Sequence, residues 1–452
     1  MKRFSLPGGR DFYRSLFVIS VPIMLQNLIN SFVNMVDTVM IGRLGTTEIA
    51  AVGLANNVFF FFTMVLFGIC SGGAIFTAQF WGRRDIQGIR KNAGLCLILN
   101  VAAALFFTLA VIVFPEKILG IYSGDQAVIE TGARYLKTLS PSFVPFSISF
   151  VFTLTLRSVE RVRLAMVATL IALSINMGLN WALIFGAGPV PALGVTGAAL
   201  ATVIARFTEF GILAAVSYRK RYEVAGTLAE FTGFNRAFAG RFLSITAPVI
   251  GNEIIWALGI TVQNIIFART GTGAIAAFNI TNTVSQLAWV VFIGLGNGVA
   301  VLIGKKIGEG DEGAARDYAR RITVFAPVLA AAVALCLYPL SLLLPLVFRV
   351  NETVLGFTSI MFVILCCSYP FRAFNMTLIV GVCRAGGDTI FCVLFEVIFM
   401  WGYSLPLGAA LAYFGNAPVW VIYLVLCSED VFKMICGLWR LKSGRWLNNV
   451  IG

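Results

Sequence analysis

The composition of the chain indicates an integral membrane protein. Of its 452 residues, 59% are hydrophobic and only 12% are charged, whereas a typical soluble domain has roughly 25% charged residues. The chain has no His, and its nine Cys include no CxxC pair, so neither a zinc site nor a disulfide framework is expected. We therefore expect no enzyme activity and no cofactor.

Twelve apolar stretches follow one another along the chain, each about 20 residues or longer, the length that crosses a bilayer as a helix. The first follows the basic segment MKRFSLPGGRDFYR and is too long for the core of a signal peptide, so we expect it to remain as a helix. The predicted spans lie near residues 14–41, 50–81, 92–114, 128–156, 164–187, 194–217, 242–268, 274–304, 318–347, 354–383, 389–414 and 417–438.

The net charge of +13 is distributed unevenly across the predicted membrane. With a cytoplasmic N-terminus and alternating spans, 26 of the 34 Lys and Arg lie on the cytoplasmic side or near the cytoplasmic ends of spans. Six lie on the outer side or near the outer ends of spans, while Arg206 and Arg372 lie deeper within spans. This distribution follows the positive-inside rule. It predicts a multi-pass protein of the inner (plasma) membrane with both termini cytoplasmic. The basic residues then face anionic lipid, and nucleic acid is not expected as a partner.

The two halves of the chain repeat each other at a shift of 226 residues. Gly45 then aligns with Gly271 and Asp85 with Asp311, and at a shift of 227 Arg157 aligns with Arg384. Six spans per repeat is an even number, so both halves enter the membrane in the same direction, as parallel repeats. We predict an all-α protein of two pseudo-symmetric six-helix lobes, 1–217 and 242–452, joined by a cytoplasmic linker at 218–241.

Two such lobes suit an alternating-access transporter, and neither a filter-like motif nor a ring of charge indicates a channel. Ionisable residues inside spans are functional candidates, because a charge in the hydrocarbon is costly. We expect Arg206 to pair with Glu209, and Lys433 with Glu429 or Asp430. Arg372 is expected to reach Glu396 or Glu253 as a gating or structural ion pair. The candidates within spans are Asp37, Arg206, Glu209, Glu253, Arg372, Glu396, Glu429 and Asp430.

Asp37 differs from the other candidates because it has no basic neighbour in its own span, and the repeat has Gln263 in its place. Asn176 and Asn180 are four residues apart on one helical face, and Thr202 lies in the next span. An acid, two amides and a hydroxyl suit a proton or a small hard cation. A desolvated carboxyl holds its proton more readily, so Asp37 is a candidate for coupling proton entry to a conformational change. The alternative is a carboxyl that only hydrogen-bonds between helices.

An aromatic face near a carboxylate would hold lipophilic cations by charge attraction and cation–π contact. Small amphipathic cations are therefore the expected substrates, and a monomer is expected. The substrate-binding candidates are Glu253, Trp256, Gln286, Trp289, Tyr369 and Phe371.

The chain resembles the multidrug and toxic compound extrusion (MATE) family over nearly its whole length. The resemblance rests on NMVDTVMIG in the first span, AAVGLANN after it, N-x-x-x-N-W in the fifth, GVTGAALAT at the start of the sixth, and the doubled lobe. It implies an antiporter that expels organic cations and other amphipathic drugs against proton or sodium entry. Asp37 matches the family's first-helix coupling carboxylate, and Asn176, Asn180 and Thr202 map to its N-lobe cation site.

Two departures from the family pattern bear on the coupling ion. Many members have Asp where this chain has Asn180, and the missing charge favours proton over sodium. One branch forms a second site from a seventh-helix Glu and a tenth-helix Asp; here Glu253 matches the Glu, but Ala373 stands in place of the Asp. A C-lobe sodium site of that kind is therefore not expected. The competing reading is a flippase for lipid-linked oligosaccharides or lipids, whose cavity should hold more cationic groups.

Overall fold

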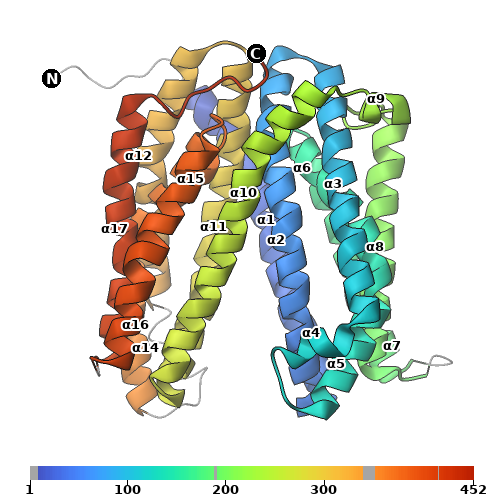
Figure 1. Ribbon diagram of the computed structural model, residues 1–452, viewed down its shortest axis with the longest axis vertical. Coiled ribbons are helices and arrows are strands. Elements are labelled where there is room, and N and C mark those ends of the chain that lie inside the picture. Colours follow the sequence, from blue (N-terminus) through green and yellow to red (C-terminus); the bar gives the residue numbers. More distant parts are fainter. Residues whose placement is uncertain (1–8, 188–190, 340–351, 416) are drawn as a thin grey trace. The chain divides into compact units, whose positions relative to one another are not determined.

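The protein is almost wholly helical in a computed structural model that describes residues 9–187, 191–339, 352–415 and 417–452 (Figure 1). The end of the ninth predicted span, 340–347, lies outside the described residues. The α-helices are α1 (Gly9–Gly42), α2 (Thr46–Arg83), α3 (Ile86–Val113), α4 (Pro115–Gly120), α5 (Gln126–Leu139), α6 (Phe143–Ser158), α7 (Val162–Phe185), α8 (Gly194–Arg219), α9 (Leu228–Thr232), α10 (Arg236–Arg269), α11 (Thr272–Gly308), α12 (Glu312–Leu337), α14 (Glu352–Met376), α15 (Thr389–Glu396), α16 (Leu405–Tyr413) and α17 (Val419–Ser443). A short 3₁₀ turn, η1 (Ser140–Ser142), joins α5 to α6.

Within the described residues, eleven helical spans are long and apolar enough to cross a membrane. Three of them are composite: α5 to α6, α14 with the segment after it, and α15 to α16. The twelfth predicted span is α17, which has 25 residues but carries Glu429, Asp430 and Lys433 near its centre. At 1.5 Å per residue its length is sufficient to span the hydrocarbon.

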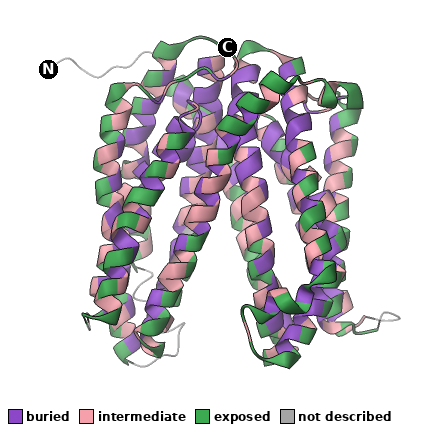
Figure 2. Cartoon of the chain, viewed as in Figure 1, coloured by how far each residue is buried: buried purple, intermediate pink, exposed green. Residues whose placement is uncertain are grey.

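The surfaces of these helices are apolar where they are exposed. Phe106 is 69% exposed, Val324 69% and Leu335 76%, and exposed faces run along the helices (Figure 2). Exposed apolar surface on this scale indicates a lipid environment rather than water. The core residues instead pack inside each bundle, as where Phe62 stacks on Phe143 with ring centroids 4.8 Å apart.

The chain forms two compact units. Unit 1 comprises Met1–Met24 and Gly251–Gly452, and unit 2 comprises Leu25–Ile250. α1 and α10 therefore each divide between the units, with the break near the middle of the helix. The lobe borders predicted at 217 and 242 follow the repeat rather than these contacts, and they stay a prediction.

The internal repeat is visible in the helix bounds. Adding 226 to the bounds of α1 gives 235–268, and α10 runs over 236–269; the same shift takes α2 to 272–309, and α11 runs over 272–308. The starts of these helices also match. Gly45 and Gly271 precede α2 and α11 with φ of 157° and 121°, and Asp85 and Asp311 each accept a hydrogen bond from a backbone N–H of the following helix. The predicted parallel duplication is therefore confirmed in local detail.

Two π-helical segments interrupt the regular helices of unit 1. η3 (Thr377–Cys383) continues α14, and η4 (Val397–Ser404) lies between α15 and α16. Such segments are uncommon and are frequently found at functional sites. Neither segment was predicted from the sequence.

The predicted linker at 218–241 contains structure of its own. The helix α9 begins with a capping box between Thr227 and Glu230. Glu230 also forms an ion pair of 2.6 Å with Arg90 in α3. The backbone N–H of Thr227 and the guanidinium of Arg90 both lower the pKa of Glu230. The linker is thus attached to unit 2 rather than free.

Candidate functional site

The Asp37 cluster, formed by Asp37, Asn176, Asn180 and Thr202, lies in unit 2 between α1, α7 and α8. The amide Nδ2 of Asn180 donates to Oδ1 of Asp37 at 2.7 Å and contacts Oδ1 of Asn176 at 3.3 Å. Nδ2 of Asn176 in turn donates to the hydroxyl of Thr202 at 3.3 Å. The structure therefore brings together all four residues that the sequence placed at one cation-coupling site.

The two asparagines in the middle of this cluster are more buried than the residues at its two ends. Asn180 is 1% exposed and Asn176 is 4% exposed, whereas Asp37 and Thr202 are half-buried. The amide oxygen of Asn180 is buried and accepts no hydrogen bond. A buried acceptor without a donor is costly, so a proton donor or a cation beside Asp37 would find an oxygen ready to receive it.

A second polar chain, the Glu209 chain, runs through unit 2 from α1 to α8. Gln26 donates to the hydroxyl of Thr169 at 2.6 Å, and that hydroxyl donates to Oε1 of Glu209 at 2.7 Å. Arg206 closes the chain with an ion pair of 2.9 Å to Glu209, and its guanidinium also lies 4.5 Å from the ring centroid of Phe146. The predicted local pair of Arg206 and Glu209 is confirmed.

An arginine contact occurs once in each unit at equivalent positions. Arg157 donates to Oε1 of Gln26 at 2.5 Å in unit 2, and Arg384 forms an ion pair of 2.6 Å with Glu253 in unit 1. Both members of the two pairs differ by 227 in number, the shift at which the sequence aligned the arginines. The repeat thus conserves the geometry of the contact but changes its charge, since Gln26 is neutral and Glu253 is acidic.

The expected partner of Arg372 is wrong. Arg372 pairs with Asp430 at 3.1 Å, not with Glu253 or Glu396, because α14 packs along α17 and faces Asp430 there. Glu253 is held by Arg384 instead. Of the two roles that the sequence left open for Glu253, substrate contact or ion pair, the structure has the ion pair, with a different arginine.

Three buried charged residues of unit 1 form what we term the Lys433 triad: Glu396, Glu429 and Lys433. The ammonium of Lys433 lies 3.1 Å from a carboxylate oxygen of each acid. The predicted contact of Lys433 with Glu429 is confirmed, and its second contact, with Glu396 in α15, was missed. Nothing in the local spacing indicated it, since the two residues are 37 positions apart.

The predicted substrate-binding residues all belong to unit 1. Trp256 and Trp289 stack with ring centroids 6.3 Å apart and planes 3° from parallel. Tyr369 is buried and meets Phe292 edge-on at 5.6 Å. Gln286 is exposed and Phe371 is half-buried. The tryptophan pair is the flat aromatic surface that a lipophilic cation could cover.

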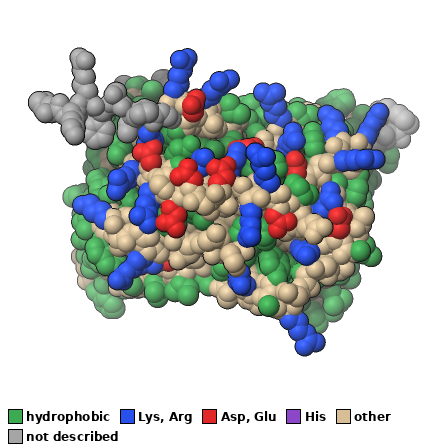
Figure 3. Space-filling model, turned by 90° about the horizontal axis from the view of Figure 1, so that it is seen from above, with side chains coloured by type: hydrophobic (Ala, Val, Ile, Leu, Met, Phe, Trp, Pro, Cys, Tyr) green, Lys and Arg blue, Asp and Glu red, His purple; other side chains and the backbone are tan. Residues whose placement is uncertain are grey.

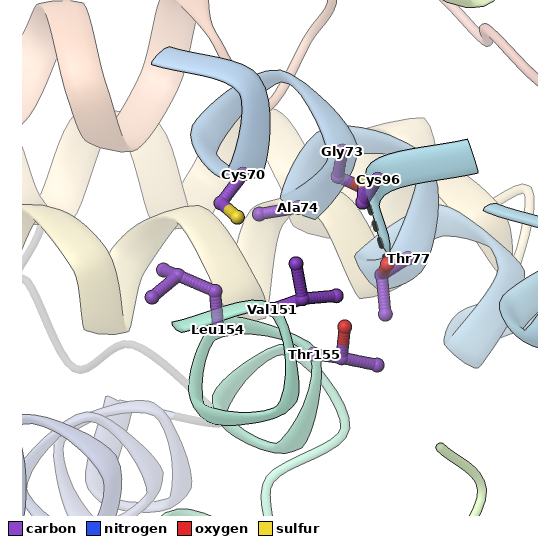
Figure 4. A pocket seen from close by; sticks show the side chains of 8 residues that line it. All are labelled: Cys70, Gly73, Ala74, Thr77, Cys96, Val151, Leu154 and Thr155. Atoms are coloured by element: carbon purple, nitrogen blue, oxygen red, sulfur yellow. Dashed lines mark hydrogen bonds between the residues drawn. The ribbon is translucent and has the colours of Figure 1, made fainter. Parts of the chain in front are cut away.

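A narrow pocket with essentially no room for even a water molecule lies within unit 2 (Figure 4). Ligand sites usually measure about 300–1,000 Å³, so this space is too small for a drug-sized molecule. Its walls come from α2, α3 and α6, and its polar atoms include the hydroxyls of Thr77 and Thr155. The lining residues are Cys70, Gly73, Ala74, Thr77, Cys96, Val151, Leu154 and Thr155.

Together these features define a polytopic helical membrane protein, built from a duplicated bundle, with acids and bases buried inside its spans. Comparison with known proteins identifies the family within this class. The MatE family model matches residues 22–182 and 248–411. The chain therefore belongs to the MatE family, whose members are transporters and not enzymes.

The relatives that match are similar along their whole length but distant in sequence. An uncharacterized transporter, YisQ of Bacillus subtilis, is 25% identical, with 98% of this chain and 96% of the relative covered. A probable multidrug resistance protein, NorM of Thermotoga maritima, is 23% identical over 96% and 93% of the two chains. A solved MOP superfamily transporter from Pyrococcus furiosus shares the fold, with a TM-score of 0.85, 18% identity and coverage of 95% and 96%.

Proposed function

We propose that this transporter expels small amphipathic cations in exchange for protons, with Asp37 as the residue that couples the two. The observation that carries the proposal is the hydrogen-bonded series from Asp37 through Asn180 and Asn176 to Thr202. It links α1, α7 and α8 by one titratable group. A change in the charge of Asp37 therefore alters contacts on three helices at once.

The balance of charge among four groups of unit 2 supports the proposal of a proton. Asp37 and Glu209 offset Arg157 and Arg206, so these four groups sum to zero when Asp37 is ionised. The charge of Arg206 also acts on Asp37. A proton on Asp37 would leave these four groups with a net charge of +1, which opposes the binding of a further cation, such as sodium, in unit 2.

The substrate class follows from charge and from the names of relatives. Among the charged groups that pair with one another in unit 1, acids outnumber bases, since Glu253, Glu396, Glu429 and Asp430 face only Arg372, Arg384 and Lys433. An anionic pyrophosphate head group would meet repulsion in such surroundings, which disfavours a flippase for lipid-linked oligosaccharides. The relative from Thermotoga maritima is named a probable multidrug resistance protein, and amphipathic cationic drugs suit the stacked pair Trp256 and Trp289.

The orientation belongs to the same proposal. Figure 3 shows Lys and Arg side chains on the face seen from above. Within unit 2, basic residues gather around the turns after α2 and α6, and within unit 1 they gather at the C-terminal end of α17; they are Arg83, Arg84, Arg161 and Arg163 in unit 2, and Arg440 and Lys442 in unit 1. By the positive-inside rule we assign these helix ends to the cytoplasm, in a plasma membrane.

The coupling ion is tested by loading purified protein into liposomes and imposing one gradient at a time. A fluorescent lipophilic cation should accumulate inside liposomes whose interior is more acidic than the outside. A sodium gradient alone should not cause accumulation. The variant N180D restores the acid found in many family members and should add dependence on sodium. Accumulation that follows sodium alone in the unaltered protein would refute proton coupling.

A further inference from the structure

Seven charged groups that pair with one another in unit 1 do not balance. Glu253 pairs with Arg384, and Asp430 pairs with Arg372, one acid to one base in each case. The Lys433 triad remains, in which two acids share a single ammonium. With every group ionised, the seven groups comprise four acids and three bases and carry a net charge of −1.

The surplus charge falls on a site that is closed to water. Glu396 is 5% exposed, Glu429 8% and Lys433 4%. A buried charge that is not balanced by an opposite one is strongly destabilising even after relaxation, and a membrane span offers no solvent to offset that cost. The surplus acid therefore has to be neutralised by something that the described ion pairs do not supply.

The charged groups on the neighbouring elements are already paired. The charge of Arg384 acts on Glu396, but Arg384 is bound to Glu253. Asp388 forms two hydrogen bonds with Arg440, at 2.7 and 2.9 Å. Arg372, on α14, faces Asp430. Within the described parts of the chain, the triad has no ion-pair partner beyond its own three members.

Ser404, at the end of η4, supplies an independent indication of what neutralises the surplus. Its hydroxyl lies 3.3 Å from the carbonyl oxygen of Met400 and also contacts Oε2 of Glu429. A hydroxyl has one hydrogen to donate, and both neighbours are acceptors when Glu429 is ionised. A proton on Glu429 resolves the conflict, because Glu429 then donates to Ser404 and Ser404 donates to Met400.

We propose that Glu396, Glu429, Lys433 and Ser404 form a second proton-binding site, separate from Asp37 and located in unit 1. One proton is shared by the two glutamates beside Lys433, and its release to water leaves a carboxylate. Sodium suits this site poorly, because the ammonium of Lys433 already lies between the two acids. The part of this inference that concerns transport rests on the proposed function: each cycle would move one proton here in addition to the one at Asp37.

The direct test is infrared spectroscopy of the purified full-length protein, which detects the carbonyl stretch of a protonated carboxyl group. It is best made in the D37N background, where Asp37 contributes no signal. We expect a protonated carboxyl at neutral pH that is lost in both E429Q and E396Q, since each variant leaves one acid for one base. S404A should shift the band without removing it.

The control variant is D388N, which removes a buried acid of unit 1 that has its own arginine. It should leave the band unchanged. A band that persists in both E429Q and E396Q, or a D37N protein with no protonated carboxyl at all, would overturn the inference. Because E429Q and E396Q give the same charge count, failure of one to fold leaves the other as the test.

A transport measurement separates this inference from the proposed function. The number of protons exchanged per substrate, obtained from the membrane potential at which flux reverses, should fall by one in E429Q. An unchanged number would refute a role in transport for the second site. If the protein exchanges no protons at all, the proposed function fails, while the infrared result still decides whether the site holds one.

Discussion

At the scale of single residues, the carboxylate of Asp37 on α1 is held by a hydrogen bond from Asn180 on α7. Asn180 gives its amide hydrogen to Asp37 and leaves its own oxygen without a donor. A hydrogen bond to a charged group contributes about 1.5–3 kcal/mol. Asn180 thus makes a contact that the ionised carboxylate of Asp37 accepts more fully than the protonated one.

Replacing Asn180 by Leu should move the pH dependence of efflux. Loss of the hydrogen bond removes a contact that only the ionised carboxylate makes fully, so Asp37 holds its proton up to higher pH. At 1.36 kcal/mol per pH unit, the midpoint of efflux should rise by about 1–2 pH units. The measurement is dye efflux from liposomes over a series of pH values.

S174A is a matched control for this change, because Ser174 lies on α7 but is exposed and bonds only to Leu170 of its own helix. It should leave the midpoint where it is. A midpoint in N180L that stays equal to that of S174A would show that Asn180 does not tune Asp37.

The arginine contact that occurs in both units predicts that loss of the arginine destabilises the protein more in unit 1 than in unit 2. R384M leaves Glu253 buried without a base, which should lower the free energy of unfolding by about 3–5 kcal/mol. R157M leaves the neutral amide of Gln26 without its donor, while Glu209 keeps its ion pair with Arg206, and its cost should be about 1–3 kcal/mol. Thermal unfolding in detergent compares the two variants. The double variant R384M/E253Q should regain much of the loss, and equal losses in R384M and R157M would contradict this account.

At the scale of elements, α7 and α8 pack closely enough that a single methyl group matters. A Cβ at Gly197 would strike the backbone oxygen of Leu183, which already accepts a hydrogen bond from Leu193. Gly178 on the same helix pair has open space where its Cβ would lie. These two helices carry three of the four residues of the Asp37 cluster, so their spacing sets its geometry.

G197A should therefore destabilise the protein, whereas G178A should not. Overpacking costs about 1–3 kcal/mol, while Gly to Ala within a helix gains about 0.5–1 kcal/mol. Melting temperatures in detergent should fall for G197A and stay level or rise for G178A. The idea of a tight α7–α8 interface fails if both variants melt alike.

The helices also show which features of the structure can be predicted from the sequence. The length of the apolar stretches was sufficient to predict the helices, because that signal is local. The 226-residue shift was sufficient to predict which helix of one half corresponds to which helix of the other, because that signal is periodic. The Asp37 cluster was predictable because Asn176 and Asn180 share one helical face and the family motif names the rest. Long-range partners were not: the contacts of Glu253 with Arg384 and of Glu396 with Lys433 depend on how helices rotate against each other. The π segments η3 and η4 carry no sequence signal at all.

At the scale of the whole molecule, the distribution of basic residues predicts the orientation. Green fluorescent protein fused to the C-terminus should fluoresce, since it folds in the cytoplasm, and an alkaline phosphatase fusion at the same place should be inactive. Fusions after α1, at the turn before α2, should show the opposite pattern. An active phosphatase at the C-terminus would reverse the assigned orientation.

The central claim is that proton entry drives substrate exit through Asp37. The most direct measurement compares two activities of D37N in liposomes: exchange of labelled for unlabelled substrate without a gradient, and accumulation under a pH gradient. The account predicts that exchange persists while gradient-driven accumulation falls at least about tenfold, or about 1.4 kcal/mol of lost coupling. If D37N accumulates substrate under a pH gradient as the unaltered protein does, Asp37 is not the coupling residue.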